Sequence, residues 1–208
     1  PSTYQVRRSE FDEVLFRNAA RKGAKAIEGC RVTSVDFHTE GAVVTARDAD
    51  GTEHSWRARF IADASGRDTF LASRLGFKQK DTKHNSAAIF GHFAGATRLP
   101  GRAEGNISIF WFDHGWFWFI PLADGVTSVG MVAWPYFMKT RKGRSRKHSY
   151  DDGTALCARL AERLRGARRD NAAEAAANFS YVSERTHGRN YLLVGDAYAF
   201  IDPMFSSG

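Results

Sequence analysis

The stretch HGWFWFIPL fills residues 114–122 and carries more aromatic surface than any other part of the chain. In a β-strand, alternate residues face opposite sides, so Trp116, Trp118 and Ile120 are expected on one face and Phe117 and Phe119 on the other. A strand that is apolar on both faces is covered on both sides, whereas most antiparallel sheets leave one face in water. We expect one cover to be the protein core, and the other to be either protein or a flat ligand.

Further strands are expected on both sides of this stretch. Residues 86–95, 106–112 and 126–134 carry runs of apolar and β-branched residues. A glycine-containing turn at 113–115 separates the opening stretch from the strand before it, and another at 123–125 separates it from the strand after it. The pattern predicts an antiparallel sheet over residues 81–134.

The segment before this sheet predicts a helix followed by a small β-meander. Ser9 and Asp12 form a capping-box pattern, and apolar residues follow from Phe11 at helical spacing until Gly23. Three short strands are expected between residues 30 and 66, with a hairpin turn at 48–51. A short helix is expected over residues 69–75.

The segment after the sheet predicts a helix over residues 152–165, with Leu156, Leu160 and Leu164 in one stripe. The alanine-rich residues 170–178 either extend this helix or form a second one. An apolar strand over 191–194 then ends at Gly195 and Asp196. Ligands of open α/β sheets bind at the carboxyl ends of strands, and a helix starting after the final turn would direct free N–H groups at an anion.

Composition limits the functional classes. The chain has 208 residues, enough for a core of its own, and its two cysteines, Cys30 and Cys157, are too far apart for a zinc motif. No metal site is therefore expected, and the cysteine usage suits a cytoplasmic protein. No apolar stretch predicts a membrane span. Both ends look cut, so we expect an internal fragment of a longer protein.

The net charge of +7 comes largely from residues 139–148 and 159–169. The simpler interpretation is a solvated loop followed by a solvated helix face. The alternative is a docking surface for an acidic partner, either nucleic acid or an acidic carrier protein. Nucleic acid is disfavoured, because no helix-turn-helix, zinc-finger or RNP pattern accompanies the charge.

Four separate segments together resemble one family. VRRSEFDEVLFRNAARKGA (6–24), ADASGRDT (62–69) and VGDAYAFIDPMFSSG (194–208) resemble the arginine helix, second flavin motif and GD motif of flavoprotein monooxygenase-type folds. GWFWFIP (115–121) matches GWxWxIP, the hallmark of flavin-dependent halogenases. The resemblance implies an α/β (α+β) fold. Residues 1–80 would be a partial FAD-binding domain, 81–150 the antiparallel substrate-side sheet with a basic loop, and 151–208 a helix and a return to the FAD-binding domain.

The same resemblance implies an oxidoreductase of the halogenase type, such as those of antibiotic biosynthesis. Reduced FAD from a separate flavin reductase and O2 would oxidise chloride or bromide to hypohalous acid, which halogenates an electron-rich aromatic substrate. Tryptophan-type members carry a glutamate before the final serine-rich turn, where this sequence has Phe205. MFSSG is more similar to members that act on phenols or pyrroles, often tethered to an acyl carrier protein. The basic segment 141–147 would then be part of a carrier dock.

The resemblance also assigns roles to individual residues. Trp116 and Trp118 would form a dry wall beside the flavin that discourages direct hydroxylation of the substrate. Asp196 would accept hydrogen bonds from ribityl hydroxyls, and Arg8 would pair with FAD phosphate or ribityl oxygens. The remaining implied FAD contacts are Ser65, Gly66, Gly195 and Pro203, and the implied halide ligands are the backbone N–H groups of Ser207 and Gly208.

The sequence departs from the family pattern in two further ways. The GxGxxG fingerprint is absent, and the catalytic lysine of the family would lie upstream of Pro1, so the fragment alone is expected to be inactive. Three alternatives stay open. Asp196 and Arg8 could be a turn cap and a surface residue; the protein could be a flavin monooxygenase or a geranylgeranyl-reductase-like enzyme; or it could be a basic binding module without catalysis.

Overall fold

The computed structural model describes residues 4–81, 86–177, 180–201 and 204. The chain forms two compact units, each built from segments that are distant in sequence. The sheet unit comprises residues 1–8, 81–180 and 201–207, and the motif unit comprises residues 9–80, 181–200 and 208. The three domain ranges expected from the sequence stay a prediction.

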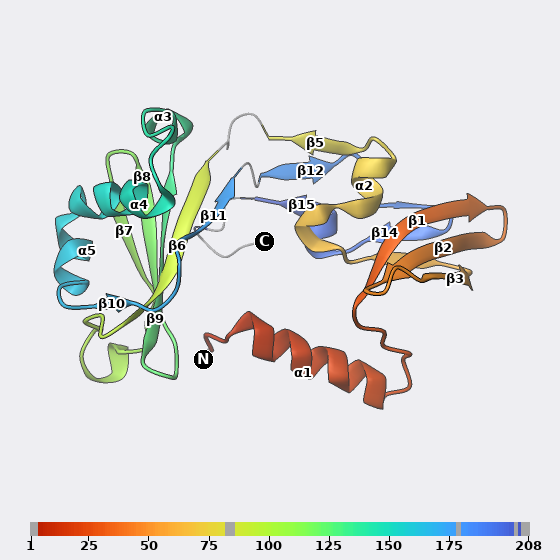
Figure 1. Cartoon of the computed structure of the whole chain (residues 1–208), viewed down its shortest axis with the longest axis horizontal. Coiled ribbons are helices and arrows are strands. Elements are labelled where there is room, and N and C mark those ends of the chain that lie inside the picture. Colours follow the sequence, from red (N-terminus) through yellow and green to blue (C-terminus); the bar gives the residue numbers. More distant parts are fainter. Residues whose placement is uncertain (1–3, 82–85, 178–179, 202–203, 205–208) are drawn as a thin grey trace. The chain divides into compact units, whose positions relative to one another are not determined.

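The sheet unit is built on one antiparallel sheet in the strand order β10-β6-β9-β8-β7, with β11 also paired to β6 (Figure 1). Its long strands are β6 (Ala87–Ala94), β7 (Ser108–Phe112), β8 (Gly115–Pro121) and β9 (Val126–Ala133). The short strands β10 (Arg168–Arg169) and β11 (Glu174–Ala177) complete it. The antiparallel sheet predicted over residues 81–134 is therefore present.

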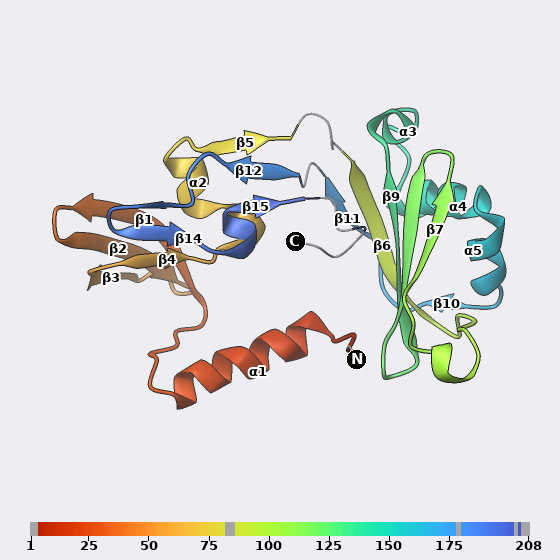
Figure 2. The same ribbon diagram turned by 180° about the vertical axis from the view of Figure 1, so that it is seen from behind.

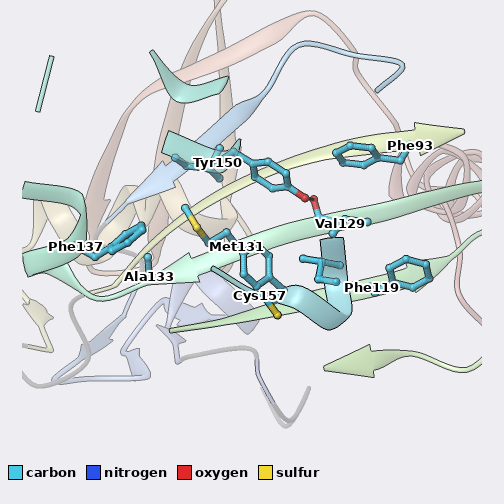
Figure 3. Packing of buried hydrophobic residues seen from close by; sticks show 11 residues of the cluster. Phe93, Phe119, Val129, Met131, Ala133, Phe137, Tyr150 and Cys157 are labelled. Carbon is cyan, nitrogen blue, oxygen red and sulfur yellow. Dashed lines mark hydrogen bonds between the residues drawn. The ribbon is translucent and has the colours of Figure 1, made fainter. Parts of the chain in front are cut away.

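The described part of the sheet unit contains three α-helices: α3 (Pro135–Lys139), α4 (Arg146–Ala155) and α5 (Ala158–Arg163). Figure 2 shows α4 and α5 on one face of the sheet. The side chains between these two helices and the sheet form the main core, which includes Phe117, Phe119, Met131, Tyr150 and Leu160, all at most 1% exposed (Figure 3). Burial of large apolar side chains at this density is the main stabilising contribution to the unit.

The predicted helix over residues 152–165 is wrong. The chain forms α4 and α5 instead, with a break at Leu156 and Cys157. The predicted stripe does not form either, because Leu160 is fully buried whereas Leu156 is 55% exposed. Both expectations for residues 170–178 are also wrong where the structure describes them, since β11 pairs with β6.

The motif unit contains all of α1 (Arg8–Arg21) beyond its first residue, and a meander of β1 (Cys30–His38), β2 (Gly41–Asp48) and β3 (Glu53–Ala58). The predicted helix start at Ser9 differs from the observed start by one residue. The unit also contains short strands: β4 (Ile61–Asp63), β5 (Lys78–Lys80), β12 (Tyr181–Ser183), β13 (His187–Gly188), β14 (Tyr191–Leu193) and β15 (Ala199–Phe200).

The pairing of β4 with β14 is parallel, unlike every other strand pairing among the described residues. Both strands end in turns that contain short helices: η1 (Gly66–Asp68) and α2 (Phe70–Arg74) follow β4, and η3 (Gly195–Ala197) follows β14. Parallel strands bring their carboxyl ends to the same sheet edge, so these turns lie together. A second, smaller core is formed by Leu71 and Ala72 of α2 together with Tyr191 and Leu193 of β14.

Candidate functional site

The first group of candidate residues lies on β8 in the sheet unit. Trp116 and Trp118 share one face, with ring centroids 6.1 Å apart, and we call this pair the tryptophan wall. Phe117 and Phe119 lie in the core on the opposite face, as the alternation predicted. Trp116 is 2% exposed, whereas Trp118 is half-buried. Trp118 is therefore the member of the wall that presents part of its ring outside the packed interior.

The wall extends across neighbouring strands. The ring of Phe90 on β6 lies 5.8 Å from Trp118, and Trp111 on β7 is directly opposite Trp116 in the strand register. Trp111 is 61% exposed, and Ile109, opposite Trp118, is 38% exposed. This face of the sheet is therefore a broad apolar surface in the form suited to a flat aromatic molecule.

The start of β8 requires glycine. Gly115 has φ 153°, and a Cβ atom there would lie 1.9 Å from the carbonyl oxygen of Val132. The backbones of β8 and β9 approach too closely at this point for any side chain. The first residue of the GWxWxIP pattern thus has a steric explanation within this sheet.

The second group of candidate residues lies in the motif unit, at the ends of β4 and β14. Ser65 and Gly66 follow β4, and Gly195 and Asp196 follow β14. The backbone N–H of Val194 donates to the carbonyl of Asp63 at 2.9 Å, and η1 contacts η3. The structure therefore brings together two motifs that are about 130 residues apart in sequence, at the strand ends where α/β folds bind ligands.

Asp63 organises the first of these turns. Its carboxylate is 7% exposed and accepts hydrogen bonds from the backbone N–H groups of Ser65 (2.9 Å) and Leu71 (2.8 Å). The hydroxyl of Ser65 accepts a further bond from the N–H of Phe70 at 2.8 Å. The sequence analysis singled out Ser65 and Gly66 but missed Asp63, although its position in the ADASG segment was the available signal.

Thr69 adds a conformational constraint to this turn. Its φ of 48° is in the left-handed region, which a β-branched residue rarely adopts. The side chain is fully buried, and its hydroxyl is 2.8 Å from both the Asp68 carbonyl and the Ser73 hydroxyl. These bonds hold the sharp connection between η1 and α2.

A pocket of about 670 Å³ lies beside this turn. Its lining contains two arginines and three hydroxyl side chains, together with apolar and acidic groups. The lining residues are Arg31, Val32, Thr33, Ser65, Asp68, Phe70, Ser73 and Arg74. The Arg74 guanidinium lies 4.6 Å from the Phe70 ring centre and donates to the Thr33 carbonyl. Guanidinium and hydroxyl donors around a cavity suit phosphate oxygens. No sequence pattern had singled out these two arginines.

Asp196 is exposed at the second turn, and its surroundings are fixed through its backbone. The Tyr181 hydroxyl donates to the Asp196 carbonyl oxygen at 2.8 Å. Burial raises the pKa of Tyr181 to about 12, and the Asp196 carboxylate acts in the same direction. Burial also lowers the pKa of Lys78, whose ammonium lies 4.1 Å from the Tyr181 ring centre. Tyr181 therefore remains a hydrogen-bond donor across the neutral range.

This arrangement predicts an alkaline loss of stability. Folded Tyr181 keeps its proton until about pH 12, whereas an unfolded tyrosine loses it near pH ~10. Since the unfolded chain releases this proton first, the contribution is fully present below pH ~10 and is lost as the pH rises towards the folded pKa. We expect Tyr181→Phe to reduce this alkaline decline and to cost about 1 kcal/mol at neutral pH through the lost hydrogen bond. Urea unfolding at a series of pH values measures both effects, with Tyr4→Phe, at an 86% exposed residue, as the control. A decline in the variant as steep as in the unmodified protein would contradict the assignment.

The other predicted residues are placed as follows. Arg8 is the first residue of α1 and is exposed, while its neighbour Arg7 is paired with Asp124. Pro203, Ser207 and Gly208 lie outside the described residues, as does Phe205. No cluster of three or more metal-ligating side chains occurs within the described part of the chain. Of the helices in that part, none has the length and apolar character to cross a membrane.

Residues 1–208 match the sequence model of the family described as tryptophan halogenase. The chain belongs to that family. This member of the tryptophan halogenase family is 33% identical over 211 residues to a tryptophan 2-halogenase from Chondromyces crocatus, covering 99% of the chain and 40% of that relative. It is 29% identical to a 1H-pyrrole-2-carbonyl-[peptidyl-carrier protein] chlorinase from Pseudomonas fluorescens, covering 99% of the chain and 47% of the relative.

A solved structure gives the same result for the fold. The chondrochloren halogenase of a myxobacterium, an FAD-dependent halogenase, superposes with a TM-score of 0.93 and 36% identity, covering 99% of this chain and 48% of that one. The predicted family and the α/β flavoprotein-monooxygenase-like fold class are confirmed. The halogenase-family chain spans about half the length of the relatives it matches, or less. The roles assigned to individual residues stay predictions.

Proposed function

We propose that the whole protein containing this chain is an FAD-dependent halogenase of electron-rich aromatic substrates, phenols or pyrroles. The observation that carries the proposal is the GWFWFIP strand, whose two tryptophans form one face of a sheet within a chain that matches the halogenase family over its full length. The reaction balances as reduced flavin, O2, a proton, a halide ion and an aromatic C–H giving oxidised flavin, two waters and a carbon–halogen bond. The halide is chloride or bromide, and a separate flavin reductase supplies the reduced flavin.

The residues at the ends of β4 and β14 fit FAD. Gly66 and Gly195 have positive φ, and a Cβ atom on either would meet nothing within 4 Å, so open space adjoins both turns. Asp196 would accept hydrogen bonds from ribityl hydroxyls. Arg31 and Arg74 would pair with phosphate oxygens. When bound there, the flavin supplies the two electrons that reduce O2.

The tryptophan wall would exclude water from the reaction chamber and fix its shape. Bulky apolar rings would leave little room for water beside a reactive oxidant, and exclusion of water limits its side reactions with solvent. The roles of Arg8, Pro203, Ser207 and Gly208 in holding FAD and halide, and the position of the catalytic lysine outside this chain, belong to the same proposal.

The decisive experiment measures the product. The purified whole protein would be supplied with a flavin reductase, NADH, FAD, O2 and bromide, and with phenols and pyrroles both free and attached to a carrier protein. We expect a product with the paired isotope masses of bromine. Oxygenated product without halogen would instead identify a monooxygenase, and a protein that binds no flavin would contradict both.

A carrier-tethered substrate is favoured by the pyrrolyl-carrier chlorinase among the relatives and by the charge of residues 139–148, which run from the end of α3 to the start of α4. Within these residues, Arg144 forms an ion pair with Asp152, and Lys147 with Asp151. Arg141 also pairs with Asp152 and lies over the Phe137 ring. Much of the charge expected from sequence to form a dock is therefore neutralised within the unit. Of the cations in residues 139–148, Lys139, Lys142 and Arg146 are exposed and have no acidic partner among the described residues.

We expect charge reversal at these three positions to raise KM for a carrier-tethered substrate by about tenfold at low salt, since each removed cation weakens electrostatic association. The kcat for the matching free substrate should not change. Reversal of Arg102, an exposed cation on η2, is the control. Equal effects of both reversals, or an effect insensitive to salt, would contradict a dock at this surface.

A further inference from the structure

We propose that Ser128 and Gly130 on β9 are positioning residues that seat the indole of Trp118, and that this seat controls how much of the oxidant ends in halogenated product. The second half of the proposal rests on the proposed function. Neither residue belongs to the GWxWxIP pattern, which lies entirely on β8.

Gly130 supplies the space in which the ring lies. It is directly opposite Trp118 in the β8–β9 register and directly opposite Phe90 in the β6–β9 register. A Cβ atom on Gly130 would lie 2.1 Å from Cζ2, 2.3 Å from Cη2 and 2.4 Å from Cε2 of Trp118. Three ring atoms thus occupy the volume of one missing methyl group. The indole therefore lies over β9 at Gly130, and any side chain at position 130 would displace it.

Ser128 fixes the rotation of the same ring. The Trp118 Nε1–H donates to the Ser128 hydroxyl at 3.1 Å. Ser128 is opposite Ile120 in the register, so this bond runs diagonally from β8 to β9. A diagonal neighbour is within reach of a long aromatic side chain. The bond gives the ring one orientation, because turning it over would leave Nε1 without this acceptor.

Trp116 shows what the seat adds. It is 2% exposed, and its Nε1 has no hydrogen-bond partner among the described residues, so close packing alone fixes its orientation. Trp118 is half-buried and lacks such packing on all sides. A half-buried ring can change rotamer readily unless specific contacts hold it. Ser128 and Gly130 provide those contacts from below, while Phe90 lies beside the ring at 5.8 Å.

The position of this ring matters because it forms the accessible part of the wall. A displacement of about 1 Å at a reaction chamber can change a rate by ~100-fold. A lifted indole would both narrow the chamber and open a path for water behind the ring. Oxidising equivalents would then be lost as hydrogen peroxide, formed from O2, two electrons and two protons, instead of reaching the halide.

The first test needs neither flavin nor substrate. Two indoles 6.1 Å apart produce an exciton couplet in the far-ultraviolet circular dichroism spectrum. In the whole protein, Trp118→Phe identifies the part of the spectrum that belongs to this pair. We expect Gly130→Ala and Ser128→Ala to alter that couplet, and Ser128→Thr, which keeps the hydroxyl, to restore it. Ser55→Ala and Gly105→Ala, at an exposed serine and at a glycine with open space around it, are the matched controls.

The second test measures halogenated product and hydrogen peroxide per NADH consumed. We expect product per NADH to fall by about tenfold in Gly130→Ala, less in Ser128→Ala, and to recover in Ser128→Thr, with peroxide rising in proportion. If Gly130→Ala fails to fold, the comparison of Ser128→Ala with Ser128→Thr still tests the proposal. An unchanged couplet in Ser128→Ala would overturn the seat. An altered couplet with unchanged product per NADH would overturn its control of the outcome. If the unmodified protein makes no halogenated product, the proposed function is contradicted, and so is the claim that the seat controls the yield of halogenated product. The couplet measurement then still decides whether Ser128 and Gly130 hold the Trp118 ring.

Discussion

Replacing Gly115 with alanine is expected to destabilise the sheet unit by about 3–5 kcal/mol, the sum of a steric overlap and a backbone conformation that alanine rarely adopts. The new methyl group would lie 1.9 Å from the Val132 carbonyl oxygen and 2.9 Å from the Ala133 Cα atom. Both are backbone atoms of β9, so no side-chain rotation can relieve the overlap. The strands would have to separate where the tryptophan wall begins. A loss of this size is a large part of the total stability of an ordinary domain.

Urea unfolding followed by tryptophan fluorescence measures this loss, because Trp116 is adjacent to the changed residue and Trp118 lies on the same strand. Gly105→Ala is the matched control, since a Cβ atom there would meet nothing within 4 Å and its φ is not in the left-handed region. We expect the control to unfold at nearly the same urea concentration as the unmodified protein. An unchanged midpoint for Gly115→Ala would show that β8 and β9 are not held at the described separation.

The sequence predicted the elements whose local pattern agrees with their tertiary surroundings. The alternation in WFWFI matches its strand, because both faces of β8 are apolar and each set of rings has a distinct neighbour. The strand before Gly195 and the turn at Ser65 were predicted as well, since turn residues after an apolar run signal a strand end. Their spatial contact could be expected only through the family resemblance, because no local pattern connects residues so far apart in sequence.

The errors arose where tertiary contacts override local propensity. The leucines at 156, 160 and 164 suit one helix, yet the chain turns at Cys157, whose Sγ lies 3.8 Å from the Trp111 carbonyl oxygen. A Cβ atom on Gly153 would lie 2.2 Å from Met131 Sδ, so α4 ends closely packed on β9. The alanines at 175–177 favour a helix by propensity, but the edge of β6 offers unpaired backbone groups that a strand satisfies. Arg31 and Arg74 were missed because they come from distant segments of the chain, and residues that meet only in the folded pocket form no recognisable pattern in the sequence.

Replacing Asp63 with alanine is the second change with a large expected effect, on stability and on FAD binding together. The substitution removes both acceptors of the Ser65 and Leu71 N–H groups and leaves these donors unpaired. An unpaired buried donor costs about 1–3 kcal/mol; the Leu71 N–H is buried, whereas the Ser65 N–H is only partly buried and costs less, so we expect a total loss of ~2–4 kcal/mol. Asp63→Asn should recover only part of it, because the amide nitrogen cannot accept the second bond.

The effect on FAD follows from what Asp63 holds in place. Its two hydrogen bonds fix both ends of the segment from Ser65 to Leu71, which contains η1 and borders the pocket lined by Arg31 and Arg74. In the whole protein we expect at least a tenfold rise in the Kd for FAD. Quenching of flavin fluorescence measures it, without urea and at a temperature at which circular dichroism shows that the variant is still folded.

Asp50→Ala, at an exposed carboxylate in the β2–β3 turn, controls for the loss of one negative charge. Since removal of a carboxylate would by charge alone strengthen the binding of an anionic cofactor, weaker binding in Asp63→Ala can only come from the loss of the turn's geometry. Unchanged or tighter FAD binding by a folded Asp63→Ala protein would show that this turn does not form the flavin site.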